Sequence, residues 1–208
     1  MVRAFPISKV TNHKQISIST DILDVSNNFS FTFENAGYVH SGKIYTVKVE
    51  EITEKPITLG DILQDNVDED YYLSEDQIKK FEYLKGKKQI PRVSKTGYKY
   101  IFSEGGIPFP DLLDKPSRTI LTSESIVSRT THVVKDPHTN RLRRLTPVEV
   151  ERLQGFTDEW TNTGMPIRFR YFCMGNALVV PMVTRMAKVL NDIVEEEANE
   201  KRKKTILV

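Results

Sequence analysis

The sequence predicts an α+β protein, in which a small, mixed, loop-rich domain of short strands is followed by helices. Three observations lead to this prediction. Residues 29–50 alternate apolar and polar side chains, as strands do. Residues 87–130 are rich in Lys, Arg, Gly, Pro, Ser and Thr, which favours short strands joined by long loops. Apolar residues recur at helical spacing across residues 179–193.

Composition narrows the class of protein. The 208 residues are 38% hydrophobic, with a mean hydropathy of −0.40. The longest apolar stretches, such as "ALVVPMV", are too short to cross a bilayer. The N-terminal "MVRAFPISKV" lacks the apolar core of a signal peptide. A single cysteine permits no internal disulfide, so we expect a reducing, cytoplasmic setting.

Charge is unevenly distributed along the chain. Net charge is +2, but residues 91–145 hold 10 Lys/Arg against 5 Asp/Glu, whereas residues 1–90 hold 11 against 14. Residues 146–208 hold 9 of each sign. A basic middle is typical of a surface that faces a polyanion such as nucleic acid. A solvated surface with an excess of cations is the alternative.

The first predicted strands lie in "FSFTFENAGYVHSGKIYTVKVE", residues 29–50. Phe29, Phe31 and Phe33 alternate with polar neighbours, and Ser41-Gly42 between two apolar-rich segments predicts a hairpin turn. The following "KPITLGDILQD" predicts a short turn or helix.

A capped helix is predicted from Ser74. Ser74 and Gln77 have the spacing of a capping box, and Gly86 supplies the stop. Ile78 and Phe81 form its apolar stripe, so we expect a structural role.

Aromatic residues are interleaved with the basic residues of the 87–130 stretch: Tyr98, Tyr100, Phe102 and Phe109. This pattern suits a surface that binds nucleic acid. The alternative is a loop-rich β subdomain in which the aromatic rings form the core.

A short, sharply bounded helix is predicted in "RLRRLTPVEVERLQGF". Thr146 caps it, Pro147 occupies the first helical position, and Glu149 closes a capping box. Gly155 ends it.

One last helix is predicted to run from "RFRYFCMGNALVVP" into the charged C-terminal tail. Pro181 is expected in or just before its first turn. Its apolar stripe recurs at three- and four-residue steps: Val179, Met182, Val183, Met186, Leu190 and Ile193.

The stretch "RRLTPVEVERLQGFTDEW" resembles the ninth conserved motif of DNA cytosine-5 methyltransferases, whose pattern is R-x-L-T-P-x-E-x-x-R-L-Q-G-F-P-D. Thr157 departs from the pattern, since the family has Pro there. Eleven positions match: Arg143, Leu145, Thr146, Pro147, Glu149, Arg152, Leu153, Gln154, Gly155, Phe156 and Asp158.

A second resemblance follows about twenty residues later. "MGNALVVP" is similar to the tenth motif, G-N-x-V-x-x-P, through Gly175, Asn176, Val179 and Pro181, with Leu178 in the usual Val position or the Val displaced by one residue. "LDKPSRTILT", residues 113–122, resembles the segment that closes the family's target-recognition region, less specifically. The family's order of motifs is kept, and coverage is strongest from residue 143 to about residue 190.

The resemblance implies a fold and a set of site residues. The family has a large AdoMet-binding α/β domain and a smaller target-recognition domain, with DNA between them. The ninth motif organises the recognition domain, and the tenth lines the pocket for S-adenosyl-L-methionine. It implies that glycine at 175 lets the backbone approach the cofactor; the alternative is a plain helix start. The implied cofactor-binding residues are Gly175, Asn176, Ala177 and Leu178.

The catalytic half of the family pattern is missing from the sequence. We find no F-x-G-x-G loop, no Pro-Cys nucleophile and no Q-x-R-x-R motif. Glu34-Asn35-Ala36 is the string nearest to the Glu-Asn-Val triplet that holds the flipped cytosine, and we interpret it as a chance match. The helices are therefore expected to complete the α/β domain of a catalytic partner chain.

Cys173 is interpreted as a small buried residue beside the helix start, although activation of its thiolate by Arg170 or by the N-terminus of the last helix stays open. The four histidines, His13, His40, His132 and His138, lack partners at metal-ligand spacing, so no metal is expected. His132 is expected to contact DNA or to pack in the core. An independent cysteine hydrolase is a weakly supported alternative.

The expected function is recognition of a short sequence in duplex DNA, as one subunit or the C-terminal part of a restriction-modification cytosine-5 methyltransferase. The chain begins with its own Met, so a natural subunit, inactive alone, is favoured. Its setting would be the bacterial cytoplasm, at the nucleoid. Alternatives are a stand-alone DNA-binding module and a truncated remnant. The expected DNA-binding residues are Arg92, Lys95, Lys99, Arg118, Thr119, Thr122 and Arg129.

Three regions are expected along the chain. Residues 1–55 would form a connecting segment rich in β-hairpin, and residues 56–145 the target-recognition domain. Residues 146–208 would carry the ninth and tenth motifs on helices that dock on the catalytic domain.

Overall fold

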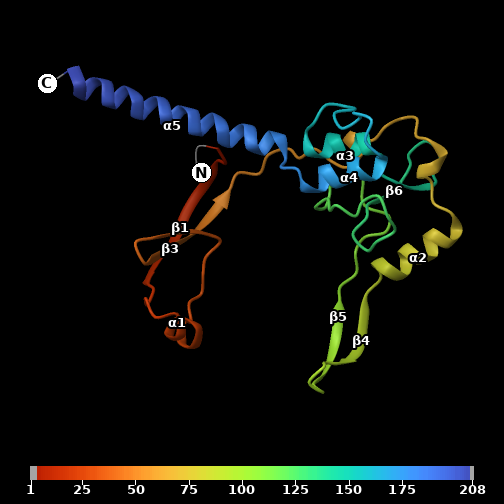
Figure 1. Cartoon of the computed structure of the whole chain (residues 1–208), viewed down its shortest axis with the longest axis horizontal. Coiled ribbons are helices and arrows are strands. Elements are labelled where there is room, and N and C mark those ends of the chain that lie inside the picture. Colours follow the sequence, from red (N-terminus) through yellow and green to blue (C-terminus); the bar gives the residue numbers. More distant parts are fainter. Residues whose placement is uncertain (1–3, 207–208) are drawn as a thin grey trace. The chain divides into compact units, whose positions relative to one another are not determined.

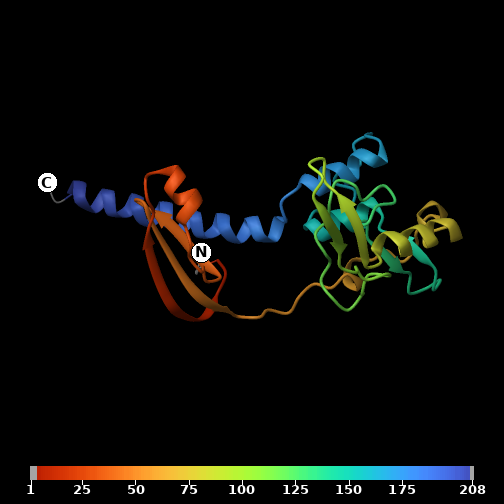
Figure 2. The ribbon, with the colours of Figure 1, turned by 90° about the horizontal axis from the view of Figure 1, so that it is seen from below.

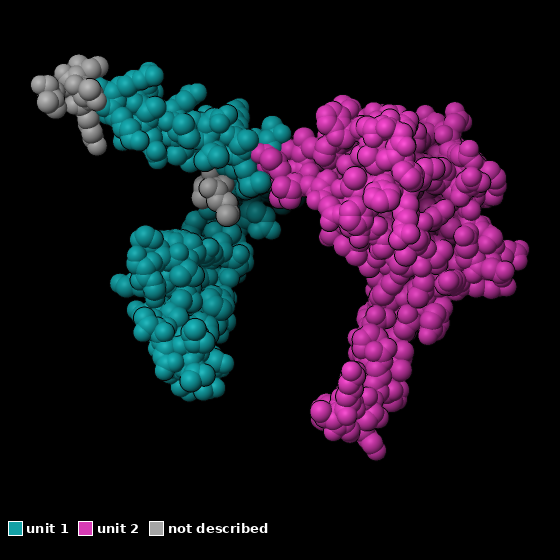
Figure 3. Space-filling model, viewed as in Figure 1, with its two compact units in different colours: residues 1–55, 184–208 teal, residues 56–183 magenta. Residues whose placement is uncertain are grey.

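The computed structural model describes residues 4–206 and shows an α+β chain in two compact units. One unit joins Met1–Lys55 with Thr184–Val208, and the other is Pro56–Val183 (Figure 3). Between residues 4 and 206, helices are too short or too polar for a membrane span.

The first unit contains a three-stranded antiparallel sheet in the order β1-β3-β2 (Figure 1). Its strands are β1 (Ile7–Ser17), β2 (Ala36–His40) and β3 (Lys43–Glu51), and the short helix α1 (Ile22–Asn28) follows β1. The predicted hairpin is confirmed: β2 pairs with β3 in register Tyr38↔Tyr45. Ser41 and Gly42 form its turn with φ of 47° and 71°, the left-handed region that such tight turns require.

Two features of this unit differ from the sequence prediction. The strand expected at Phe29–Phe33 is absent, because this segment follows α1 as an irregular stretch outside the sheet. Its rings instead cluster with one another, with Phe31 and Phe33 edge to face at 5.4 Å. Strand β1 had not been predicted, since two register shifts and a left-handed residue at Asn12 break its alternation.

The second unit contains the remaining short elements. It begins with the 3-10 turns η1 (Gly60–Ile62) and η2 (Glu69–Tyr71) and the helix α2 (Glu75–Lys85). The hairpin of β4 (Lys88–Val93) and β5 (Lys99–Glu104) follows, and then the pair β6 (Val133–Lys135) and β7 (Leu142–Arg144). Helices α3 (Pro147–Gln154) and α4 (Ile167–Asn176) complete it. The predicted capping box of Ser74 and Gln77 is present at the start of α2.

Two apolar clusters hold this unit together. The larger one joins elements far apart in sequence, with Leu59, Val134, Leu145, Val150 and Tyr171 all at most 2% exposed. The smaller one packs Phe81 of α2 against Val133 of β6. Phe102 and Tyr98, by contrast, lie outside both clusters, so the basic and aromatic stretch contributes only part of its rings to the core.

The C-terminal region forms two helices where one had been expected. Helix α4 ends at Asn176, with Ala177 as its C-cap, and α5 (Val180–Ile206) begins three residues later. Figures 1 and 2 show α5 as one uninterrupted helix. Gly175 and Asn176 therefore close a helix rather than precede one, while Pro181 lies in the first turn of α5, as predicted.

Candidate functional site

The ninth-motif helix α3 is bounded by the signals read from its sequence. The Thr146 hydroxyl accepts a hydrogen bond from the Glu149 backbone N–H at 3.2 Å, and the Glu149 carboxylate accepts one from the Thr146 N–H at 2.8 Å. Pro147 takes the first position, and Gly155 ends the helix with φ 80°. Six of its eight residues are buried, so α3 is part of the core of its unit.

A buried ion-pair network fixes the start of α3. The Arg143 guanidinium donates to Asp136 from Nε at 2.8 Å, and to both Glu149 oxygens at 2.8 and 2.9 Å. All three side chains are at most 1% exposed. Bidentate geometry of this kind compensates the cost of removing the charges from water. The network ties β7 to α3 and to the loop after β6.

The electrostatics of this network are strongly perturbed. Burial would raise the pKa of Asp136, but hydrogen bonds from the Thr139 and His138 backbone and from Arg143 lower it to about 2. Burial would lower the pKa of Arg143, yet its bonds to Glu149 and Asp136 raise it above the ordinary value. The charged form of both groups is therefore favoured.

A second buried pair, not predicted from sequence, lies on the other side of α3. The Glu151 carboxylate accepts from Arg170 of α4 at 2.9 Å and from the Thr161 backbone at 3.0 Å. Burial opposes the ionised form of Glu151, but the Thr161 and Arg170 hydrogen bonds lower its pKa overall. Glu151 and Arg170 are 19 residues apart and separated by a loop, so no local sequence pattern predicts that they pair.

The remaining ninth-motif residues connect α3 to its neighbours. Arg152 pairs with Asp158 at 2.7 Å and donates to the Ile62 carbonyl at 3.0 Å. The Gln154 amide donates to the Met174 carbonyl of α4 at 2.8 Å. A Cβ at Gly155 would lie 2.4 Å from a side-chain carbon of Pro181, so only glycine fits against the start of α5.

The tenth-motif segment lies against the loop expected to close the recognition region. A Cβ at Gly175 would come within 2.4 Å of the Thr122 backbone nitrogen and 2.6 Å of the Leu121 carbonyl carbon. Close packing of residue 175 against the backbone of residues 121–122 therefore requires glycine there, and the sequence did not predict this contact. The Asn176 amide donates to the Phe172 carbonyl at 3.0 Å. Ala177 packs against the larger core cluster, and Leu178 is exposed.

The structure divides the seven expected DNA-binding residues into three groups. Arg92, Lys95 and Lys99 lie together and exposed on the β4–β5 hairpin. Thr119 and Thr122 are exposed on the loop against Gly175.

Arg118 and Arg129 are instead engaged within the protein. Arg118 pairs with buried Asp111 at 2.6 Å and donates to the Thr130 carbonyl. Arg129 donates to the Leu84 carbonyl at 2.6 Å and also to the carbonyls of Gly86 and Gly105. These two arginines hold the loops around the hairpin base.

Asp111 gathers three donors at the centre of these loops. Besides Arg118, it accepts from the Val133 N–H at 2.9 Å and from Lys85 at 3.3 Å. Burial of Lys85, only 1% exposed, lowers the pKa of its ammonium group. Burial would raise the pKa of Asp111, but these donors lower it.

His132 packs in the core, which decides between the two roles expected for it. The ring is fully buried, with Nδ1 at 2.9 Å from Glu124 and Nε2 at 3.1 Å from the Ser117 hydroxyl. Contact of His132 with DNA is therefore ruled out by its burial. Among residues 4–206, no cluster of His, Cys, Asp and Glu could hold a metal ion.

Two further candidates are placed in structural roles. Asn35 exchanges two hydrogen bonds of 2.8 Å with the backbone of Val49, which fixes the edge of the sheet. Cys173 lies within α4 and packs, half-buried, against the larger core cluster.

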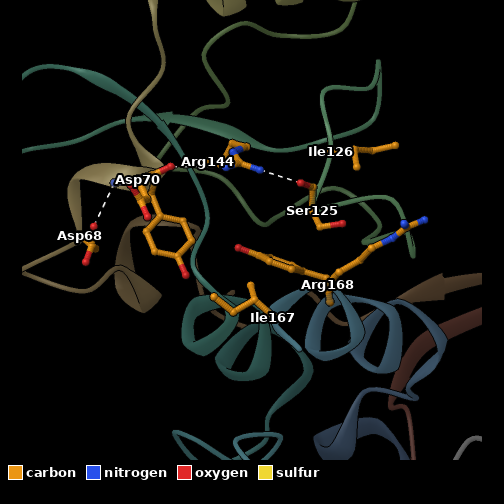
Figure 4. Close-up of a pocket in the computed structure, with 9 residues that line it drawn as sticks. Asp68, Asp70, Ser125, Ile126, Arg144, Ile167 and Arg168 are labelled. Carbon is orange, nitrogen blue, oxygen red and sulfur yellow. Dashed lines mark hydrogen bonds between the residues drawn. The ribbon is translucent and has the colours of Figure 1, made fainter. Parts of the chain in front are cut away.

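A hollow of about 500 Å³ opens beside α4 (Figure 4). Arg144 reaches into its wall and donates to the Ser125 carbonyl at 2.7 Å, while Tyr71 and Tyr171 present their rings. Asp68, Asp70 and Arg168 give the wall both signs of charge, so it does not select for one class of ion.

The buried ninth-motif helix is joined through Gln154 to Met174 of α4 and packs through Gly155 against Pro181, so the two motifs that resemble those of DNA cytosine-5 methyltransferases lie in contact. The pattern of the C-5 cytosine-specific DNA methylase family matches residues 9–192. The chain belongs to this family.

Three known proteins show the extent of the likeness. The type II methyltransferase M.Sau3AI of Staphylococcus aureus is 49% identical over 193 residues, covering 91% of this chain and 46% of that protein. The chain thus spans about half the length of that relative. The Dnmt2 methyltransferase of S. pombe superposes with a TM-score of 0.47 at 14% identity, over 74% of this chain and 52% of that one. The Entamoeba histolytica methyltransferase EhMeth gives 0.46 at 20% identity, over 88% and 54%.

Proposed function

We propose that this chain is the DNA-recognition subunit, or the C-terminal part, of a site-specific cytosine-5 DNA methyltransferase of a restriction-modification system, and we favour the subunit, acting with a separate catalytic chain. The partner would supply the glycine loop for S-adenosyl-L-methionine, the nucleophilic cysteine and the glutamate that holds the flipped base. The observation that carries the proposal is that the sequence holds the ninth motif at residues 143–158 and the tenth at residues 175–181, without an F-x-G-x-G loop or a Pro-Cys pair.

The exposed apolar side chains of the first unit support the presence of a partner chain. Among its described residues, Ile44 is a rare buried apolar side chain, whereas Ile22, Tyr38 and Val39 are exposed. The stripe of α5 is exposed as well, at Met186 and Leu190. A unit that buries so little apolar surface is expected to require another protein to complete its core.

The tenth-motif segment fits one wall of a shared cofactor site. Asn176 and Leu178 are exposed, while Gly175 and Ala177 are anchored on the second unit. In residues 175–178, the packed side would therefore be fixed by the second unit. The exposed side, with Asn176 and Leu178, would face the cofactor, and the partner chain would form the remaining walls of the pocket. S-adenosyl-L-methionine supplies the methyl group when bound.

The exposed cations support DNA as the substrate. Within the described part of the chain, Arg92, Lys95 and Lys99 form no ion pair, and they would be free to contact phosphates or bases. Thr119 and Thr122 would face the same substrate from the loop beside Gly175. Arg118 and Arg129 would act indirectly, by holding these loops in place.

Co-expression tests the proposal. The chain is produced with a candidate partner that carries F-x-G-x-G, Pro-Cys and Glu-Asn-Val, and methylated cytosines are mapped by bisulfite sequencing. We expect methylation at one short sequence only when both chains are present. A matched control replaces the Pro-Cys cysteine of the partner with alanine, which should abolish methylation while the two chains still co-purify.

Two outcomes would overturn the proposal. One is methylation of duplex DNA by the 208-residue chain with S-adenosyl-L-methionine alone. The other is failure of the two chains to associate, with DNA binding by this chain unaffected by the partner. The second outcome would favour a stand-alone DNA-binding module, which the well-formed core of the Pro56–Val183 unit also supports.

A further inference from the structure

The β4–β5 hairpin is exposed on both faces. Val93, Tyr98 and Ile101 are 63%, 70% and 67% exposed. Figure 3 shows this hairpin as an arm of the Pro56–Val183 unit, beyond the bulk of that unit. A two-stranded hairpin is marginally stable in water by itself, so a bound ligand that covers the arm would stabilise it.

One face of the hairpin is cationic and aromatic. Arg92 of β4 pairs across the strands with Tyr100, and its guanidinium carbon lies 3.9 Å from the centroid of the Phe102 ring. Tyr98 and Tyr100 stack with their planes within 10°. The Phe102 ring thus packs against the Arg92 guanidinium in a cation–π contact.

The other face is mostly apolar. Val93 and Ile101 lie with Pro91 around a shallow hollow of about 250 Å³, whose lining also includes Arg92, Lys99 and Tyr100. The turn between the strands is fixed by its own hydrogen bonds, since the Ser94 N–H donates to the Tyr98 carbonyl at 2.8 Å. The Tyr98 N–H returns a bond to the Ser94 hydroxyl at 3.0 Å. Lys95 is therefore held at a rigid tip.

Charge selects the class of partner. Residues 87–104 contain five basic residues and one acidic residue, Glu104, which pairs with Lys88 at the hairpin base. Of the remaining cations, Lys87 lies at the hairpin base just before β4, and Arg92, Lys95 and Lys99 lie along the arm toward its tip. A polyanion complements this surface better than a protein surface does. A two-stranded ribbon also fits the major groove of B-DNA, which is about 12 Å wide.

We propose that the β4–β5 hairpin enters the major groove of the target duplex and reads bases there. Arg92 donates to a guanine edge, with Tyr98 and Tyr100 beside it. Lys95 and Lys99 bind the flanking phosphates. The inference rests on the proposed function, because it takes duplex DNA as the substrate.

Binding and methylation measurements test this inference. Three variants are made in the full chain: Arg92→Ala, Lys95→Ala and the double variant Tyr98→Ala/Tyr100→Ala. The charge-matched controls are Lys79→Ala and Lys80→Ala, at exposed positions of α2. Binding to a fluorescent 30-base-pair duplex is followed by anisotropy at several salt concentrations. Site preference is read by bisulfite sequencing of the two-chain enzyme.

The variants should differ in kind. Arg92→Ala should weaken specific binding about 10- to 100-fold and relax the sequence preference at one base pair. Lys95→Ala should weaken binding to all sequences and lower the slope of log K against log salt by about 1. The control variants should match the parent. Thermal unfolding should be unchanged throughout, since these side chains lie outside both core clusters.

Other results would overturn the inference, and they are distinct from failure of the proposed function. Unchanged affinity and site preference in all three hairpin variants would exclude groove entry, even if the two-chain enzyme methylates DNA. Loss of association with the catalytic chain, with DNA binding intact, would instead make the hairpin a protein-docking arm. Conversely, hairpin-dependent DNA binding without methylation by any chain pair would sustain the inference and refute the split enzyme.

Discussion

A methyl group at Gly175 would lie 2.4 Å from the backbone nitrogen of Thr122. Real side chains do not approach a backbone this closely, so the tenth-motif segment and the loop of residues 113–122 are in direct contact with no space between them. The residues proposed to bind the cofactor are thereby fixed by a loop that also carries exposed Thr119 and Thr122.

Gly175→Ala should therefore separate the loop from α4. We expect a destabilisation of about 1–3 kcal/mol, as for other overpacked sites, measured by urea unfolding of the full chain. In the two-chain enzyme the KM for S-adenosyl-L-methionine should rise. Gly105→Ala is the matched control, because its Cβ would meet nothing within 4 Å. Equal stability of the two variants would contradict the contact.

Replacing Arg143 with methionine should be severely destabilising. The change leaves Asp136 and Glu149 buried without their cation, and breaking such a pair costs about 3–5 kcal/mol. Thermal and urea unfolding provide the measurement. Arg141→Met two residues away is the control, since Arg141 pairs with Glu69 at the exposed surface and its loss should change the Tm little.

Asp136 should make stability depend on pH in the acid range. Its pKa in the folded chain is about 2, below the ordinary value of 3.8. A depressed pKa gives a stabilisation that is fully present above about pH 4 and is lost as pH falls toward 2. Its size is about 2 kcal/mol. In Asp136→Asn this contribution is absent. The difference in free energy of unfolding between the parent and this variant should therefore become smaller as pH falls from 6 to 2.5. A constant gap over that range would contradict this assignment.

Cys173→Ala should leave methylation by the two-chain enzyme unchanged within about twofold. The side chain packs on the core from within α4, and alanine removes only one sulfur atom there. Initial rates with tritiated S-adenosyl-L-methionine give the comparison. A loss comparable to that of the partner's Pro-Cys cysteine would instead make Cys173 a catalytic residue.

Arg118→Ala and Lys99→Ala should both weaken DNA binding, for different reasons. Arg118 anchors a loop on Asp111, so its removal should lower the Tm together with the affinity. Lys99 is exposed on the hairpin, so its removal should lower the affinity alone. Parallel Tm and anisotropy measurements distinguish the two, and an unchanged Tm in Arg118→Ala would argue against an anchoring role.

Local chemistry made much of the fold predictable. The caps at Ser74 and Thr146, the stop at Gly155 and the turn at Ser41-Gly42 each satisfy their backbone within a few residues, and the structure confirms them. Strand β1 and the break between α4 and α5 were not predictable in this way. In β1, bulges disrupt the alternation, and α4 ends where the backbone of Ala177 becomes extended, with ψ 155°.

The site was predictable in its motifs but not in its contacts. The ninth motif identified the pair of Arg143 and Glu149, yet Asp136, the second carboxylate that pairs with Arg143, lies outside the motif. Arg118 and Arg129 were expected to bind DNA, whereas the Asp111 carboxylate, seven residues away, and the Leu84 carbonyl, 45 residues away, accept hydrogen bonds from them. Long-range pairing of this kind is decided by the folded backbone, which periodicity and charge do not describe.

The burial of α3 has a consequence for engineering new specificities. A chimera that exchanges only residues 56–145 with a related enzyme would cut between Arg143 and Glu149, and would join side chains that evolved apart. A transplant of residues 56–183 carries both clusters and both buried salt-bridge networks intact. The cassette boundary for swapping target sites therefore falls in the first turns of α5 rather than before the ninth motif.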